Sequence, residues 1–200
     1  MINTPQTTKE RIIAAAFEAI RTEGFAGATS RAIARIGGFN QALVFYHFGS
    51  VDNLLLAALD TSSAARLARY RGVLDEAGSV SELVRIAGEI YREDRDGGHT
   101  AVVAQLVSGS LARPELAPAI VERMEPWIEF CEDAIRRVVA GTPLEAIAPV
   151  RELAYAVMTF YLGVNLLTHL DADSSRTDAL FARITELAPV LEGLLPGQAG

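Results

Sequence analysis

Helical periodicity along nearly the whole chain constrains the fold more than any other feature of the sequence. Apolar residues recur three or four positions apart, and the interruptions are short clusters such as EAGSVS, RDGGHT, ARPE and AGTP. This spacing gathers apolar side chains on one face of an α-helix, and no segment has the alternation typical of a strand. With 200 residues, half of them hydrophobic, we expect an all-α globular protein with a substantial core.

Four helices are expected in about the first seventy residues, because capping residues and glycines mark the boundaries of helical stretches there. The fourth stretch contains the apolar run LLLAAL. In chain order, the expected boundaries are Thr7 or Thr8 to Gly24, Thr29 or Ser30 to Gly38, Asn40 to Phe48, and a start at Ser50 and Asp52.

The second and third of these helices have the spacing of a helix-turn-helix, in which two helices cross closely through a tight turn. Ala34 provides a small residue for the crossing, and Gly38 lies four positions later where the chain must reverse. We expect Ile33, Phe39 and Val44 to fill the space beneath, so that the outer face of the third helix can enter a major groove. The alternative is that the two helices only pack together and are not a DNA-binding motif.

The helix order and the stretch VFYHFGSVDNLL resemble the TetR family of bacterial transcriptional regulators, whose usual text is close to IAxxAGVSxxxLYxHFxSKxxLL. The resemblance is strong over residues 8–60 and extends further only in length, helix order and paired apolar seams. It implies a three-helix DNA-binding domain over 1–52 and a helical ligand-binding and dimerisation domain over 53–200. It also implies a homodimer that binds palindromic double-stranded operator DNA and is released by a small-molecule effector.

The resemblance and the available hydrogen-bond donors together select ten candidate DNA-binding residues. Three positions depart from the family text: Val51 replaces a lysine, Phe45 replaces a tyrosine, and Ile36 takes a place that is usually basic. The candidates are Thr29, Ser30, Arg31, Asn40, Gln41, Ala42, Leu43, Tyr46, His47 and Ser50.

Formal charge is distributed unevenly along the chain. Residues 1–60 hold five basic and five acidic side chains, so the whole net charge of −7 belongs to residues 61–200. Phosphate can also be bound by hydroxyls, amides and helix N-terminal N–H groups, and Gln41 can pair with an adenine in two hydrogen bonds. We therefore expect DNA binding with a modest salt dependence, in which dimerisation supplies much of the affinity.

Two apolar seams near the end of the chain predict a dimer interface. Apolar residues step by four and three positions over 153–167 and again over 180–194. This is more apolar surface than one bundle needs, so we expect a four-helix interface between two copies; burial within one monomer is the alternative. The residues are Leu153, Val157, Phe160, Val164, Leu167, Leu180, Ile184, Leu187 and Leu191.

Several polar and aromatic residues of the second domain are candidates for lining an effector cavity, with plain core packing as the alternative. An amide in the nearly uncharged segment 153–170 needs a partner, whether protein, water or ligand, or else fixes the register of the dimer seam. We also expect Pro126 to kink a helix over 115–140. The candidates are Gln105, Met124, Trp127, Cys131, Tyr155, Tyr161 and Asn165.

Catalytic and metal chemistry lack a supporting motif. His47 has no nucleophile or acid beside it, and His99, His169 and Cys131 form no pair at helical i, i+4 spacing, so no metal or other cofactor is expected. A helical-bundle enzyme or metal-binding protein is the alternative, but its Glu-x-x-His motif does not occur. The resemblance favours a non-enzymatic, ligand-responsive repressor; a ligand-independent architectural DNA binder is a further alternative.

Compartment is inferred from cysteine usage and from the N-terminal residues. One cysteine and a polar start without an apolar signal segment favour the cytoplasm. Residues 153–170 are apolar enough to suggest a membrane span, but their length and flanking residues favour a helix buried in protein. We therefore expect no membrane partner.

Overall fold

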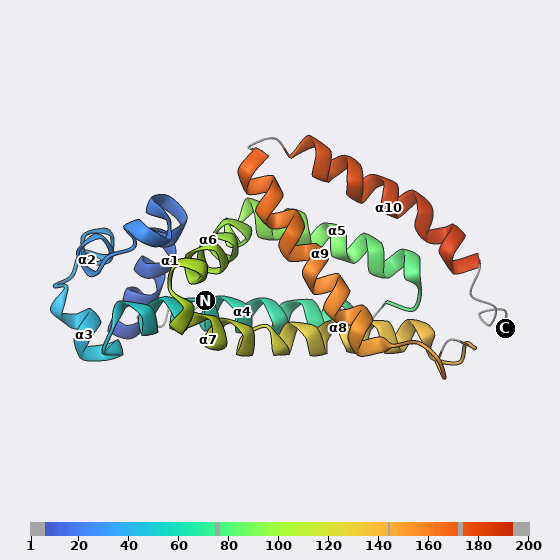
Figure 1. The fold of residues 1–200 in the computed structure, drawn as a ribbon, viewed down its shortest axis with the longest axis horizontal. Coiled ribbons are helices and arrows are strands. Elements are labelled where there is room, and N and C mark those ends of the chain that lie inside the picture. Colours follow the sequence, from blue (N-terminus) through green and yellow to red (C-terminus); the bar gives the residue numbers. More distant parts are fainter. Residues whose placement is uncertain (1–6, 75–76, 144, 172–173, 194–200) are drawn as a thin grey trace, which may run out of the picture. The chain divides into compact units, whose positions relative to one another are not determined.

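The computed structural model describes residues 7–74, 77–143, 145–171 and 174–193, apart from the side chain of Leu191. Helices dominate these residues and no strand occurs among them, which confirms the predicted all-α class (Figure 1). The described chain packs as two compact units. The first unit extends to Ala65 and includes Ala101–Glu122, whereas the second comprises Arg66–Thr100 and the residues from Arg123 onward.

Seven helical elements contribute to the first unit, including the beginning of α4 and most of α6. They are α1 (Thr8–Gly27), α2 (Ser30–Gly37), α3 (Ala42–Phe48), α4 (Val51–Leu74), α6 (His99–Ala112), the 3-10 helix η1 (Pro114–Leu116) and α7 (Ala117–Glu122). The second unit holds the rest of α4 together with α5 (Val80–Asp96), α8 (Glu125–Val139), α9 (Val150–Asp171) and α10 (Ser175–Gly193).

Local capping signals place the starts of α1 and α2 where the sequence predicts them. The Thr7 hydroxyl accepts the Glu10 N–H at 3.2 Å and the Glu10 carboxylate accepts the Thr7 N–H at 2.7 Å, which is a capping box. The Thr29 hydroxyl accepts the Ala32 N–H at 3.2 Å at the start of α2. These side chains satisfy amides that the first helical turn leaves unpaired.

Gly24 interrupts α1 instead of ending it. Its φ of 74° is positive, but its ψ of 174° is extended and does not form a left-handed cap. The helix resumes for the residues up to Gly27. The conformation at Gly24 is one that essentially only glycine adopts without strain.

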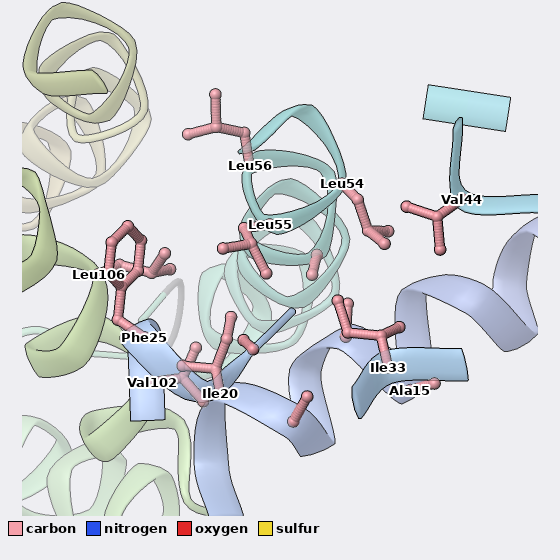
Figure 2. Close-up of a cluster of buried hydrophobic side chains, with 14 of the residues drawn as sticks. Ala15, Ile20, Phe25, Ile33, Val44, Leu54, Leu55, Leu56, Val102 and Leu106 are labelled. Atoms are coloured by element: carbon pink, nitrogen blue, oxygen red, sulfur yellow. The ribbon is translucent and has the colours of Figure 1, made fainter. Parts of the chain in front are cut away.

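The core of the first unit forms around α1, with side chains from α2, α3, α4 and α6 converging on it (Figure 2). Ile12, Ile33, Val44 and Leu54 are completely buried, and Leu106 of α6 packs into the same cluster. Burial of four side chains from four separate helices fixes α2 and α3 against the rest of this unit.

Pro126 does not kink a long helix, so that prediction is wrong. The segment 115–140 is divided into η1, α7 and α8, and Pro126 lies in the first turn of α8 after a turn at Arg123 and Met124. The N–H groups of the first helical turn have no carbonyl partner within the helix, so proline, which has no N–H, is tolerated there.

The second unit is assembled from two helix pairs, α8 beside α9 and α5 beside α10. Apolar clusters surround Tyr70 and Phe130, Tyr91 and Phe181, and Met158. These clusters hold the helices that carry most of the predicted ligand and dimer residues.

Candidate nucleic-acid interface and ligand site

The turn between α2 and α3 is built from two glycines with different roles. Gly38 has φ 65° and ψ 41°, the left-handed conformation of a helix C-cap, and its N–H bonds to the Ala34 carbonyl. A Cβ at Gly37 would lie 2.1 Å from the Phe39 ring and 2.9 Å from the Ala15 Cβ. The sequence identified Gly38 as the reversal, but the close approach at Gly37 was missed.

Helix α3 presents a sharply divided surface. Val44 is completely buried in the core, whereas the Tyr46 side chain two positions later is 82% exposed. Gln41 and Ala42 are also exposed, and Leu43 is half-buried with its side chain against the core. The structure therefore leaves the Gln41–Ala42–Tyr46 surface open to a partner, while Leu43 serves partly as packing.

The N-terminal end of α3 is organised by Asn40. Its Oδ1 accepts the Ala42 N–H at 2.9 Å, although the helix itself begins two residues after Asn40. The Ser50 hydroxyl accepts the Asn53 N–H at 3.1 Å at the start of α4. A hydroxyl that accepts an amide keeps its own hydrogen for donation, so Ser50 and Thr29 can still donate to a phosphate.

Basic side chains near the motif differ in how far their charge is already compensated. Arg35 pairs with Glu23, which reduces the positive field that its guanidinium presents near the motif. Arg31 is exposed, His47 and Ser30 are half-buried, and the sequence prediction omitted Lys9, whose ammonium lies 5.6 Å from the centre of the Phe48 ring. Lys9 is distant in sequence from the motif, so spacing rules gave no signal for it.

The predicted ligand residues are not gathered at one place. Gln105 belongs to the first unit, where its Oε1 accepts the Phe25 N–H at 3.2 Å. Tyr155 is exposed on α9, whereas Met124, Trp127 and Cys131 pack around Met158. Burial raises the pKa of the Cys131 thiol to about 11, which makes it a poor nucleophile or metal ligand at neutral pH.

Tyr161 and Asn165 join a buried polar centre that the sequence did not predict. Asp94 accepts hydrogen bonds from Arg66, Tyr70 and Tyr161, at 2.8, 2.7 and 2.6 Å. Asp94 lies on α5 and its partners come from α4 and α9, and separations of 24 to 67 residues along the chain hid this cluster from motif reasoning.

The predicted dimer seam is largely exposed in the single chain. Leu167 is 66% exposed, Val164 is buried, Ile184 is half-buried, and the side chain of Leu191 lies outside the described residues. The other exposed seam residues are Leu153, Val157, Phe160, Leu180 and Leu187. Helix α9 is long and apolar enough to cross a membrane, and only 22% of its apolar window is buried, contrary to burial inside one chain.

Metal-binding clusters of three or more His, Cys, Asp or Glu side chains are absent from the part of the chain that the structure describes.

Comparisons with known proteins agree in both sequence and fold. Residues 12–58 match the family model for bacterial regulatory proteins of the tetR family. The HTH-type transcriptional regulator UidR of Escherichia coli K12 is 22% identical over 178 residues, which cover 89% of each chain.

Solved structures extend the likeness to nearly the whole chain. The fatty acid degradation regulator FadR from Bacillus halodurans matches with a TM-score of 0.74 and 16% identity, covering 93% of this chain and 96% of that chain. FadR from Bacillus subtilis in complex with stearoyl-CoA matches with a TM-score of 0.71 and 16% identity, over 89% and 96% of the two chains. The family model and UidR both describe transcriptional regulators, which agrees with the prediction of a non-enzymatic protein and disfavours the bundle-enzyme alternative.

Proposed function

Because the chain belongs to the TetR family of bacterial regulatory proteins, we propose that it represses transcription as a homodimer bound to a palindromic operator. In this proposal residues 1–52 bind DNA and residues 53–200 bind an effector and the second copy. The protein acts in the cytoplasm, where the operator is, and needs no membrane.

The observation that carries the proposal is the division of α3 between a buried Val44 and a protruding Tyr46. A short helix anchored by one buried side chain and exposed on the opposite surface can lie in a major groove. Gln41 would pair with an adenine edge, and Tyr46 and the N-terminal ends of α2 and α4 would contact phosphate. The exposed part of the half-buried Leu43 side chain would contact a thymine methyl.

The exposed apolar surface of α9 and α10 supports the dimer. Contiguous exposed apolar surface of this kind is typical of an interaction site, and a second copy provides an identical surface that can cover it. Two α3 helices held about 34 to 36 Å apart would meet successive major grooves on one side of the duplex.

The effector acts through its differential affinity for two forms of the dimer. A ligand that prefers a form with wrongly spaced α3 helices reduces operator binding by the ratio of its two affinities. Release on effector binding makes the protein a repressor whose target genes respond to that compound.

Selection of bound fragments from random DNA tests the proposal directly. We expect an inverted repeat whose half-site centres are separated by about 10 base pairs or a multiple of a helical turn. The Gln41→Ala variant should relax the preference at one position per half-site and keep the half-site spacing. Recovery of no motif, or of a motif without two-fold symmetry, contradicts the proposal.

A further inference from the structure

The buried polar centre of the second unit joins three helices through one carboxylate. Asp94 of α5 is 1% exposed, and its two oxygens receive Arg66 and Tyr70 from α4 and Tyr161 from α9. The guanidinium of Arg66 also lies 4.8 Å from the centre of the Trp127 ring. A buried carboxylate needs a cationic partner and several donors, and Asp94 has both.

Two buried polar atoms of this centre have no hydrogen-bond partner among the described residues. They are Nε of Arg66, which is a donor, and Oδ1 of Asn165, which is an acceptor. Asn165 is 2% exposed, and its Nδ2 donates to the Tyr161 carbonyl at 2.7 Å. Burying such atoms unpaired costs free energy, so an unpaired donor and an unpaired acceptor in one centre point to a bound molecule.

Both atoms are tied to the same hydrogen-bond network. Arg66 and Tyr161 donate to the same oxygen of Asp94, and Asn165 lies one helical turn beyond Tyr161 on α9. Trp127 and Tyr70 contribute aromatic surface next to Arg66. The centre therefore combines aromatic side chains with one unpaired donor and one unpaired acceptor, groups that are typical of the lining of a small-molecule site.

The charges of the centre disfavour a charged ligand. Arg66 and Asp94 neutralise each other. Burial and then Asp94 raise the pKa of Tyr161 well above its ordinary value, so its hydroxyl remains a neutral donor. Burial, followed by the charge of Arg66, lowers the pKa of His99, which keeps that imidazole neutral at neutral pH. An ionic ligand would bring a buried charge without a counter-charge.

We propose that the effector is an uncharged aromatic compound that presents an acceptor to Nε–H of Arg66 and a donor to Oδ1 of Asn165. Hydroxylated aromatic amides belong to this class. The inference rests on the proposed function, because it names the chemical class of the effector that function requires.

Tryptophan fluorescence tests the proposal without DNA, since Trp127 is the one tryptophan of the sequence and lies against Arg66. The full chain is titrated with neutral 4-hydroxybenzamide, anionic 4-hydroxybenzoate and cationic benzamidine. We expect saturable binding of the neutral probe at least about tenfold tighter than binding of either ion. Absence of saturation by the neutral probe, or tighter binding of an ion, overturns the proposal.

Two conservative variants locate the probe. Asn165→Leu removes the acceptor at nearly constant volume, and Arg66→Lys keeps the charge beside Asp94 but lacks the Nε donor. Each should weaken 4-hydroxybenzamide binding about tenfold or more. Unchanged affinity in both variants shows that the two atoms do not bind the probe and overturns the proposal.

Matched controls repeat the same substitutions elsewhere. Asn53→Leu lies in the first unit, and Arg69→Lys lies on α4 at an exposed ion pair with Glu93. Both should keep the affinity of the parent protein for the probe. A protein that binds the probe but recovers no operator overturns the proposed function alone, whereas operator recovery without probe binding overturns this inference alone.

Discussion

The backbone N–H of Phe25 donates to Oε1 of Gln105 at 3.2 Å, and this bond joins the break in α1 to α6 across 80 residues of chain. Gly109 and Arg113, which follow Gln105 at intervals of four residues, lie against the Phe25 ring. A Cβ at Gly109 would lie 2.3 Å from the Phe25 ring, and the Arg113 guanidinium lies 5.0 Å from the centre of that ring. Arg113 also pairs with Asp52 at the start of α4.

Gly109→Ala should destabilise the protein, because the new methyl group would collide with the Phe25 ring. Overpacking of this kind costs about 1–3 kcal/mol of unfolding free energy. Urea denaturation followed by circular dichroism measures the change.

Gly72→Ala is the matched control, since a Cβ at that position in α4 meets nothing within 4 Å. Helix propensity alone should then raise stability by about 0.5–1 kcal/mol. Equal effects of the two substitutions would mean that Phe25 moves aside at no cost.

Gln105→Leu should leave the Phe25 N–H without its acceptor. We expect a loss of about 1–3 kcal/mol in unfolding free energy, because a partly buried donor would be unpaired. Gln105→Glu retains a carboxylate oxygen at the same reach and should lose less. If thermal denaturation ranks the two variants in the opposite order, the bond to Phe25 is not what Gln105 contributes.

The sequence predicted those parts of the DNA-binding motif that depend on short-range rules. The caps at Thr7 and Thr29 and the reversal at Gly38 each involve partners within four residues, so spacing identifies them. Val44 was assigned to the core because the helical period of the motif places it beneath the turn.

Features that depend on distant partners could not be found in this way. A side chain at position 109 would collide with the Phe25 ring, and Asp94 accepts hydrogen bonds from Arg66 and Tyr161. The residues of each contact lie far apart along the chain. Pro126 was compatible either with a kink or with a first turn, and the turn preceding α8 decided between them.

Val51→Lys should increase both operator affinity and its salt dependence, because it restores a cation at the first residue of α4. Each additional phosphate contact steepens the slope of log K against log salt by about 0.9, or by about 1.8 per dimer. Val73→Lys, in the exposed last turn of α4, is the control and should leave the slope unchanged. An unchanged slope for Val51→Lys would place that residue away from phosphate. The parent dimer should have a slope no steeper than about −8.

Leu167→Glu should weaken the proposed dimer by placing a charge in an apolar interface. We expect dissociation at micromolar concentration in sedimentation experiments, since an unpaired buried charge costs several kcal/mol. Leu111→Glu changes a leucine that is more exposed, in the first unit, and should leave the mass unchanged. A Leu167→Glu variant that sediments like the parent would exclude this surface from the interface.

Acid should destabilise the second unit through His99. Burial, then the charge of Arg66, lowers the pKa of His99 in the folded protein below its unfolded value. The unfolded chain therefore binds the proton more readily, and the stabilising contribution present above about pH 6.5 is lost as pH falls through the folded pKa. His99→Gln should lose less stability than the parent between pH 7 and pH 5, which urea denaturation at the two pH values measures.

The exposed leucines of α9 and α10 have a consequence for how much working repressor a cell contains. Where a second copy covers that surface, assembly depends on the square of the concentration of free chains. Halving synthesis near the dissociation constant then removes more than half of the operator-competent protein. The target genes would be switched on by scarcity of the regulator as well as by its ligand.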